Sequence, residues 1–328
     1  MPKNILITGA NGFIGSFLAE LLAEQGHRIR CAVRKNSNLR WLDHSQNEIF
    51  QLDWNNPDSL KRAVSDQDII FHLAGVTKAK NNKTYFEGNV GITQSLLDAF
   101  DRYGPAHQKV IYISSQAAAG PSQDGTPVKE SDPPFPVSVY GQAKLETEKI
   151  ILSYSKDHWA TIIRPPSVYG PRDRDVFALF QNIHRGILPL LGDGTSTVSL
   201  VHVYDLINGI DLASQHDASK DQVFFICGDG MYDWSTIGDT IARCLNKRPK
   251  KVTIPVFVLD LLSRTSEMIA YFSSKPALLN RDKVQEMKQK HWVCSNEKAK
   301  NVLGYMPKIS LQTGIKETAD WYLENHWL

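Results

Sequence analysis

Three glycines spaced three residues apart constrain this chain more than any other feature of its sequence. Gly9, Gly12 and Gly15 follow the apolar run 5–7 within LITGANGFIG, and apolar residues at helical spacing come directly after them. A turn between a strand and a helix directs backbone N–H groups and the positive end of the helix dipole to one point, and glycine lets a phosphate approach closely. The pattern therefore predicts a dinucleotide diphosphate site, with a tight turn that binds no ligand as the alternative.

The first half of the sequence alternates short apolar runs with amphipathic stretches, which is typical of βαβ units. Such units build a parallel sheet covered by helices on both faces, and right-handed crossovers make it doubly wound. The expected strands are 4–8, 28–33, 48–52, 68–73, 110–114 and 161–164, and the expected helices are 12–25, 58–65, 89–103 and 140–156. We expect an α/β fold with a nucleotide-binding domain over 1–164, a mainly substrate-binding domain over 165–328, and segments near 198–215 that return to the first domain.

The balance of charge argues against nucleic acid as a partner. The 328 residues include 37 Lys and Arg against 35 Asp and Glu, a net charge of +2, and the basic residues are scattered. The four cysteines lie far apart and form no CxxC pair, which indicates reduced thiols. The first residues lack the apolar run of a signal peptide, and no run of about 18 uncharged apolar residues occurs. We therefore expect a cytoplasmic protein without a transmembrane segment.

The residues after the second expected strand bear on which nicotinamide cofactor binds. In CAVRKNSNLRWL, Arg34 ends the strand, Lys35 and Arg40 follow, and no acidic residue occurs before Asp43. An acid here would accept a hydrogen bond from a ribose 2′-hydroxyl, whereas a guanidinium suits a 2′-phosphate. The pattern favours NADP(H) over NAD(H), and a surface arginine in a loop is the alternative. Asp53, after the third strand, is a candidate acceptor for the adenine amino group, or else an acid at a helix start.

The stretch YGQAK places Tyr140 and Lys144 four residues apart on an expected helix, and so on one face of it. A tyrosine with an ordinary pKa of about 10 is a poor base at neutral pH, and a neighbouring ammonium lowers that pKa. Tyr140 would then be a usable general acid or base for a carbonyl or an alcohol. A hydroxyl at the end of the preceding strand, from Ser114 or Ser115, is a candidate hydrogen-bond donor to the same substrate oxygen.

Three motifs together, TGANGFIG (8–15), YISSQAAAG (112–120) and YGQAK (140–144), resemble the extended short-chain dehydrogenase/reductases, the NAD-dependent epimerase/dehydratase superfamily. FHLAG (71–75), NVGIT (89–93), RPPSVYGP (164–171) and LVHVYDL (200–206) extend the resemblance over nearly the whole chain. It implies a Rossmann fold, a doubly wound parallel sheet, with a smaller C-terminal substrate-binding domain. Within the family, AVRKNSN is similar to dihydroflavonol reductases, and IYISSQAAAGPS is similar to 3β-hydroxysteroid dehydrogenases.

The resemblance also implies roles for individual residues. Tyr140 would be the catalytic acid or base, Lys144 would bind the nicotinamide ribose and lower the tyrosine pKa, and Ser115 matches the family's serine better than Ser114. The implied contacts to the cofactor come from Gly9, Asn11, Gly12, Phe13, Ile14, Gly15, Arg34, Asp53, Leu73, Ala74, Tyr140, Lys144 and Pro165, and no metal is implied. The family often dimerises through the helix that carries YxxxK, so we expect a homodimer.

The function that we expect is an NADP(H)-dependent oxidoreductase that interconverts a ketone and a secondary alcohol on a moderately large apolar or mixed substrate. A nucleotide-sugar epimerase with tightly bound NAD is the alternative enzyme, and Arg34 counts against it. A non-catalytic dinucleotide-binding sensor is the alternative of another class, and the set of Ser115, Tyr140 and Lys144 counts against that. Residues 252–272, the most apolar segment, are expected to form a core helix, a lid over the substrate or a helix on a membrane surface.

Overall fold

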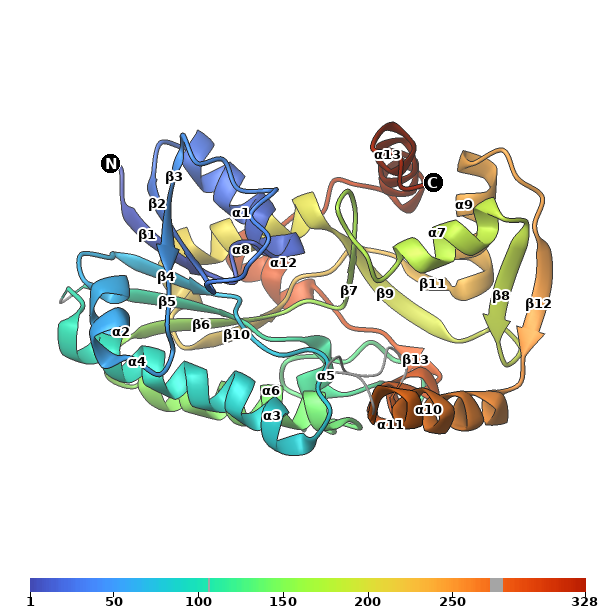
Figure 1. The fold of residues 1–328 in the computed structure, drawn as a ribbon, viewed down its shortest axis with the longest axis horizontal. Coiled ribbons are helices and arrows are strands. Elements are labelled where there is room, and N and C mark those ends of the chain that lie inside the picture. The colour runs from blue at the N-terminus through green and yellow to red at the C-terminus, as the bar shows by residue number, and fades with distance from the viewer. Residues whose placement is uncertain (106, 272–279) are drawn as a thin grey trace.

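The structure is a computed structural model that describes residues 1–105, 107–271 and 280–328. Its main sheet contains β1 (Asn4–Thr8), β2 (Arg28–Val33), β3 (Asn47–Gln51), β4 (Ile69–His72), β5 (Lys109–Ile113), β6 (Trp159–Arg164) and β10 (Gln222–Phe225). These strands lie in the order β10-β6-β5-β4-β1-β2-β3, and every neighbouring pair is parallel (Figure 1). The six predicted strands are all present, and the predicted α/β fold with a doubly wound parallel sheet is confirmed.

Helices cover both faces of this sheet. One face carries α1 (Phe13–Glu24), α8 (Val203–Gln215) and α12 (Glu297–Leu303), and the other carries α2 (Pro57–Val64), α4 (Ile92–Tyr103) and α6 (Val139–Tyr154) (Figure 1). Successive side chains of a strand point to opposite faces, so Ile5 and Ile7 join one core cluster while Leu6 joins the other. Burial on both faces explains why the strands are continuous apolar runs.

Three short elements complete the second face: α3 (Asn82–Phe86), a π-helical turn η1 (Glu87–Gly91) and α5 (Gln116–Ala119). The predicted helix 89–103 is therefore corrected at its start, since regular α-helix begins only at Ile92. The side-chain amide of Asn89 donates to the carbonyl oxygen of Tyr85 at 2.8 Å. A side chain that occupies a carbonyl of the preceding turn disturbs the regular hydrogen-bond ladder, which accounts for the π-helical turn.

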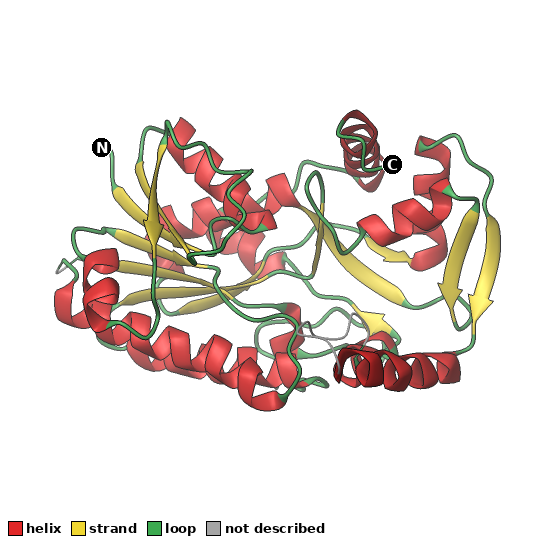
Figure 2. Cartoon of the chain, in the orientation of Figure 1, coloured by secondary structure: helices red, strands yellow, loops and turns green. Residues whose placement is uncertain are grey.

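The C-terminal part of the chain holds two smaller sheets. Strand β9 (Thr197–His202) pairs with β7 (Ser167–Tyr169), β11 (Met231–Asp233) and β13 (His291–Trp292), and β8 (Ile187–Leu191) pairs with β12 (Lys250–Ile254). The helical elements here are α7 (Phe177–His184), η2 (Asp217–Ser219), α9 (Trp234–Cys244), α10 (Val256–Tyr271), α11 (Arg281–Met287) and α13 (Leu311–Glu324). Figure 2 shows this C-terminal part beside the main sheet. Helices α13 and α10 lie on opposite sides of the C-terminal part.

Segments from late in the sequence return to the main sheet. Of the stretch near 198–215, α8 packs against α1, whereas β9 belongs to the smaller sheet. Strand β10 and helix α12, neither of which was predicted, also join the main sheet and its core.

The apolar segment 252–272 is not one helix from its start. Its first residues belong to β12, and α10 begins after Pro255. Proline forces the residue before it into extended backbone and has no N–H to donate, so strand and helix are separated at this point. Residue 272 lies outside the described residues. In the described part of the chain, no helix combines the length and apolar character needed to cross a membrane.

Candidate active site

The glycine turn joins β1 to α1 and leaves no room for side chains. Gly9 has a φ of +72°, and a Cβ there would lie 2.9 Å from the backbone nitrogen of Ala74. A Cβ on Gly15 would collide with the carbonyl oxygen of Gly9. Among the described residues, no side chain caps the N-terminus of α1 at Gly12, so its first N–H groups lack an internal acceptor. These features fit a dinucleotide diphosphate, which helix N-termini attract.

Other predicted cofactor residues surround this turn. Asn11 Nδ2 donates to the carbonyl oxygen of Asn38 at 3.4 Å, which ties the turn to the loop after β2. Phe13 and Ile14 are half-buried in the first turn of α1. Leu73 and Ala74 follow β4, the neighbour of β1, and are half-buried.

The structure places Pro165, Arg34 and Asp53 at the ends of three further strands. Pro165 is buried after β6, and its carbonyl oxygen accepts from the N–H of Gln116 at 2.8 Å. Arg34 is exposed at the end of β2 and makes no ion pair with any described residue. Asp53 is exposed before α2, and its Oδ1 accepts from the N–H of Asn55 at 3.0 Å. Only Arg34 among these three offers an exposed cation.

Arg40 packs on two tryptophan rings. Its guanidinium is 4.2 Å from the ring centroid of Trp41 and 5.3 Å from that of Trp327, near the C-terminus. The ring of Trp41 also lies 5.7 Å from that of Trp321 in α13. The loop after β2 is thus held against the C-terminal residues, and Arg34 remains as the candidate for a 2′-phosphate.

The three predicted catalytic residues lie on α5 and α6, which pack against each other. Ser115 caps α5, and its Oγ accepts from the N–H of Ala117 at 3.1 Å. Tyr140 is half-buried in the first turn of α6, and Lys144 follows one turn later as a buried residue. Ser114 Oγ donates to Glu148 at 2.5 Å, so Ser115, rather than Ser114, has its hydroxyl beside Tyr140.

Burial changes both ionisable groups of this set. Desolvation lowers the pKa of Lys144 to about 7, and the carboxylate of Glu148 acts in the opposite direction. The pKa of Tyr140 is raised, first by burial and next by the charge of Glu286, while a hydrogen bond with Ser115 opposes the rise. This differs from the prediction that Lys144 lowers the tyrosine pKa. Lys144 Nζ instead donates to the carbonyl oxygen of Ile113 at 2.7 Å.

A buried ion pair behind Lys144 was missed from the sequence. Arg164 donates to the two carboxylate oxygens of Glu148, from Nε at 2.9 Å and from Nη2 at 2.6 Å. The pair ties α6 to the end of β6 and so positions Lys144. A signal was present, because Glu148 lies four residues after Lys144 on the same helix and Arg164 begins the motif RPPSVYGP.

Two carboxylates at the N-terminus of α6 were also missed. Asp282 accepts from the N–H of Val139 at 2.5 Å and from the N–H of Tyr140 at 3.3 Å, and Glu286 accepts from Ser138 Oγ at 2.8 Å. Negative charge is favourable at a helix N-terminus. Both acids come from α11, some 143 residues further along the chain, so no local pattern connects them to Tyr140.

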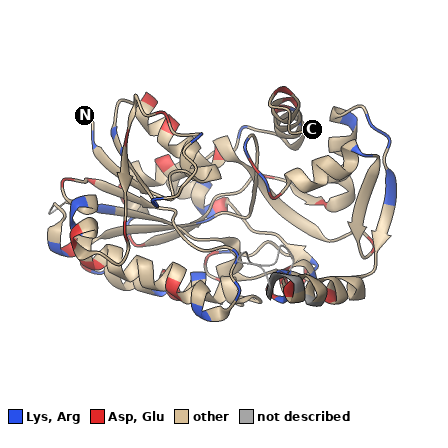
Figure 3. Ribbon diagram, viewed as in Figure 1, with Lys and Arg blue, Asp and Glu red and all other residues tan. Residues whose placement is uncertain are grey.

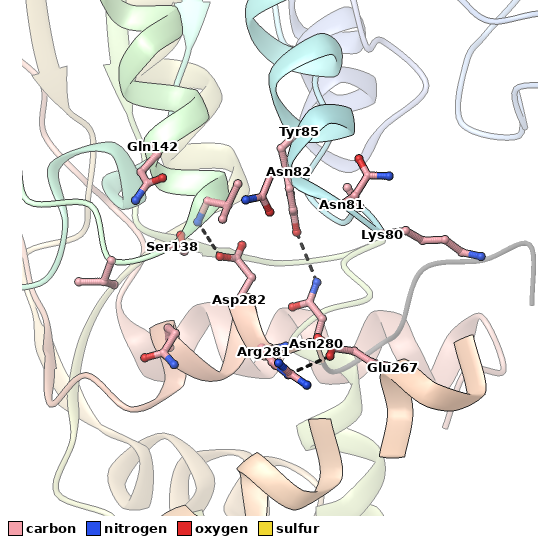
Figure 4. A pocket seen from close by; sticks show the side chains of 14 residues that line it. Lys80, Asn81, Asn82, Tyr85, Ser138, Gln142, Glu267, Asn280, Arg281 and Asp282 are labelled. Carbon is pink, nitrogen blue, oxygen red and sulfur yellow. Dashed lines mark hydrogen bonds and ion pairs between the residues drawn. The ribbon is translucent and has the colours of Figure 1, made fainter. Parts of the chain in front are cut away.

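A cavity of about 840 Å³ opens at the start of α6 (Figure 4). Its lining combines apolar and polar side chains, and the residues that form it are Ala79, Lys80, Asn81, Asn82, Tyr85, Val137, Ser138, Val139, Gln142, Glu267, Asn280, Arg281, Asp282 and Gln285. The ring centroid of Tyr85 is 6.4 Å from that of Tyr140. The cavity has room for a moderately large ligand. No group of His, Cys, Asp and Glu among the described residues is arranged to hold a metal ion.

The fold and the glycine turn define a dinucleotide-binding enzyme of the Rossmann class. The chain belongs to the NAD dependent epimerase/dehydratase family, whose model matches residues 5–227, and so to the extended short-chain dehydrogenase/reductases. It is similar to the ceramide reductase of Caulobacter vibrioides, with 26% identity over 99% of this chain and 96% of that protein. The 3 beta-hydroxysteroid dehydrogenase/Delta 5-->4-isomerase of Mycobacterium tuberculosis is also 26% identical, over 97% of this chain and 90% of its own length.

A solved structure gives the same result. The UDP-glucuronic acid 4-epimerase from Bacillus cereus, in complex with UDP-glucuronic acid and NAD, has a TM-score of 0.80 and 26% identity, and covers 98% of this chain and 99% of its own. The predicted family and the predicted enzyme class are therefore confirmed.

Proposed function

We propose that the chain is an NADP(H)-dependent oxidoreductase that interconverts a ketone and a secondary alcohol on a moderately large apolar or mixed substrate. The observation that carries the proposal is the position of Tyr140, with the Ser115 hydroxyl as its partner and a mixed cavity at the start of its helix. The similarity to a ceramide reductase and to a 3 beta-hydroxysteroid dehydrogenase supports a large apolar substrate.

Each residue of the site has its own role in the proposed proton transfer. A bound nicotinamide would supply or accept the hydride at the substrate carbon. In reduction, Tyr140 gives its phenolic proton to the oxygen of the ketone, and in oxidation it takes a proton from the alcohol. Ser115 donates a hydrogen bond to the same oxygen. Lys144 in its charged form would bind the nicotinamide ribose, and Glu148 keeps the lysine pKa at about 7 against the effect of burial.

Arg34 supports NADP(H) as the cofactor. Its exposed guanidinium follows β2 at the position where a 2′-phosphate is held in this fold, and it makes no ion pair with the described residues. The homodimer formed through α6 and the cytoplasmic location remain predictions that accompany this proposal.

The cofactor part of the proposal is tested by titrating the stripped protein with NADPH and with NADH at one salt concentration. We expect tighter binding of NADPH, and a loss of about tenfold to hundredfold in Arg34→Ala, since a charged hydrogen-bond partner of the phosphate is removed. Arg28→Ala is the matched control, because Arg28 is an exposed arginine at the opposite end of β2. Tighter NADH binding, or an equal loss in both variants, would refute the role of Arg34.

The catalytic part is tested with Tyr140→Phe in a screen of long-chain and polycyclic ketones, followed by NADPH consumption. The variant should bind NADPH normally and lose about 10²–10⁴-fold in turnover, which is the usual contribution of a positioned acid or base. Tyr154→Phe is the control, because Tyr154 lies at the other end of the same helix and its hydroxyl has no hydrogen-bond partner among the described residues. Normal turnover in Tyr140→Phe would rule out the assigned role.

A nucleotide-sugar epimerase is the second candidate, and the similarity to the UDP-glucuronic acid 4-epimerase favours it. It predicts NAD that stays bound through purification and interconversion of sugar nucleotides without net NADPH consumption. A dinucleotide-binding sensor would bind cofactor and consume none with any ketone or sugar nucleotide.

A further inference from the structure

Helix α10 presents large apolar side chains to solvent. Phe257, Leu261 and Met268 are 74%, 63% and 62% exposed, and their spacing of four and seven residues places them on one side of the helix. The buried side of the helix carries Leu259 and Ser263. A surface helix ordinarily has the reverse arrangement, with its apolar stripe towards the core. We call Phe257, Leu261 and Met268, with the flanking Val256 and Leu262, the α10 apolar face.

Arg264 falls on the same side by its spacing, three residues after Leu261 and four before Met268. Among the side chains of α10 that the structure describes, polar groups do little to offset the apolar face. Thr265 Oγ1 donates back to the carbonyl oxygens of Leu261 and Leu262, so its hydroxyl is satisfied within the helix. Asp260 pairs with Lys288 at 2.7 Å, and Glu267 pairs with Arg281 at 3.1 Å. The carboxylate of Glu267 is therefore neutralised by Arg281 of α11, and that of Asp260 by Lys288, the residue that follows α11.

Unpaired positive charge lies at the other end of the strand that leads into α10. Lys247, Arg248 and Lys250 are exposed and form no ion pair with a described residue. Lys251 is different, because it pairs with Asp239 at 2.8 Å. Figure 3 shows the basic residues along β12, which runs directly into α10. The unpaired positive charge and the apolar helix thus lie at the two ends of β12.

The cavity at the start of α6 is next to the same helix. Glu267 of α10 lines it, together with Arg281, Asp282 and Gln285 of α11 (Figure 4). A surface that covers the α10 apolar face would therefore also lie beside the cavity.

We propose that the α10 apolar face docks on the surface of a lipid bilayer that carries anionic headgroups. Phe257, Leu261 and Met268 enter the boundary between headgroups and acyl chains, and the basic residues 247–250 attract the anionic headgroups. Pairing of the apolar faces of two copies of the chain is the alternative, and the oligomeric state tests it. Docking does not depend on the proposed reaction. The further consequence, that docking presents the cavity to substrates dissolved in the membrane, rests on the proposed function.

The test is sedimentation of the full-length protein with vesicles of phosphatidylcholine alone and of phosphatidylcholine with phosphatidylglycerol, without cofactor or substrate. We expect binding to the anionic vesicles. The double variant Phe257→Ser, Leu261→Ser should bind at least tenfold more weakly, while Met306→Ser should bind as the unchanged protein does. Met306 is the matched control because it is a comparably exposed apolar residue, located between α12 and α13.

A triple variant, Lys247→Gln, Arg248→Gln, Lys250→Gln, tests the electrostatic part. It should lose about a hundredfold in binding to anionic vesicles and become less sensitive to salt, since each of the three basic residues near the surface adds roughly fivefold to affinity. Far-ultraviolet circular dichroism and thermal midpoints close to those of the unchanged protein would show that the variants are folded.

Three results would overturn the proposal. The first is that the unchanged protein fails to sediment with anionic vesicles. The second is that the double variant binds them as well as the unchanged protein does. The third is that light scattering shows an oligomer that the double variant breaks while vesicle binding is absent, which would make the face an interface between copies. Tyr140→Phe should bind vesicles normally, so loss of the proposed reaction and loss of docking are read separately.

Discussion

We expect Glu148→Gln to destabilise the protein more than any other substitution in the site that preserves the size of the side chain. Glu148 accepts two hydrogen bonds from Arg164, at 2.9 and 2.6 Å, and one from Ser114 at 2.5 Å, and the two charged side chains are 2% and 7% exposed. Glutamine keeps the size but leaves the buried guanidinium without the carboxylate to which it donates its two hydrogen bonds. Breaking a buried pair in this way costs about 3–5 kcal/mol, which corresponds to a fall in the unfolding midpoint on the order of 10 °C.

Thermal unfolding followed by circular dichroism measures this effect. Glu146→Gln is the matched control, because Glu146 lies on the same helix in an exposed pair with Lys149, and such pairs contribute little. The double variant Glu148→Leu, Arg164→Met should recover most of the loss, since no charge is then left buried. The reasoning is refuted if Glu148→Gln unfolds at the midpoint of the control, or if the double variant is less stable than the single one.

The same substitution has a second readout at Lys144. Glu148 raises the lysine pKa against the effect of burial, so its removal should lower that pKa below about 7. More of the lysine is then neutral at pH 7, and the pH dependence of turnover should move to lower pH. If the unfolding midpoint falls but the pH profile of turnover is unchanged, the Glu148–Arg164 pair contributes to stability and not to the lysine pKa.

Three further predictions follow from the site and its surroundings. Gly15→Ala forces a Cβ against the carbonyl oxygen of Gly9, so dinucleotide affinity should fall and stability should drop by about 1–3 kcal/mol; unchanged nucleotide titrations would contradict this. Burial lowers the pKa of His72 to about 3 in the folded state, whereas the unfolded state has a pKa of about 6.5. Between these two values the unfolded state binds more protons, so stability falls as the pH drops through that range. His72→Gln should flatten this fall in urea midpoints measured at pH 7 and pH 4, and equal slopes would refute it. Glu286→Gln removes a charge that raises the pKa of Tyr140 but keeps an acceptor for Ser138, so alcohol oxidation should reach its maximum at lower pH, and an unshifted profile would exclude the effect.

Features encoded within a few residues were predictable from the sequence. The glycine turn lies between a strand and a helix because three glycines, an apolar run and a helical pattern are contiguous, and the structure has β1 and α1 at those places. Tyr140 and Lys144 share a face of α6 because they are four residues apart. The limits of the strands were predicted closely because each is a short apolar run between polar turns.

What the sequence did not reveal depends on contacts between distant segments. Asp282 and Glu286 reach α6 from α11, and nothing near residue 140 encodes them. The change from β12 to α10 had a local signal in Pro255, but the apolar content of 252–272 concealed it. Arg40 followed the predicted pattern of basic residues, yet its stacking on Trp327 depends on a ring almost at the chain end.

Strand β10 and helix α12 come late in the sequence but belong to the main sheet and its core. The main sheet therefore cannot be completed while only its first six strands have been synthesised. Until residues 222–225 leave the ribosome, β6 is an open edge strand that can pair with another chain. Ala299, Leu303 and Tyr305 belong to the same core as Ile7 and Leu18, so that core stays incomplete until residues 299–305 have been made. A fragment that ends at residue 164 would therefore expose both an edge and apolar surface and should aggregate, and nascent chains need protection over most of their length.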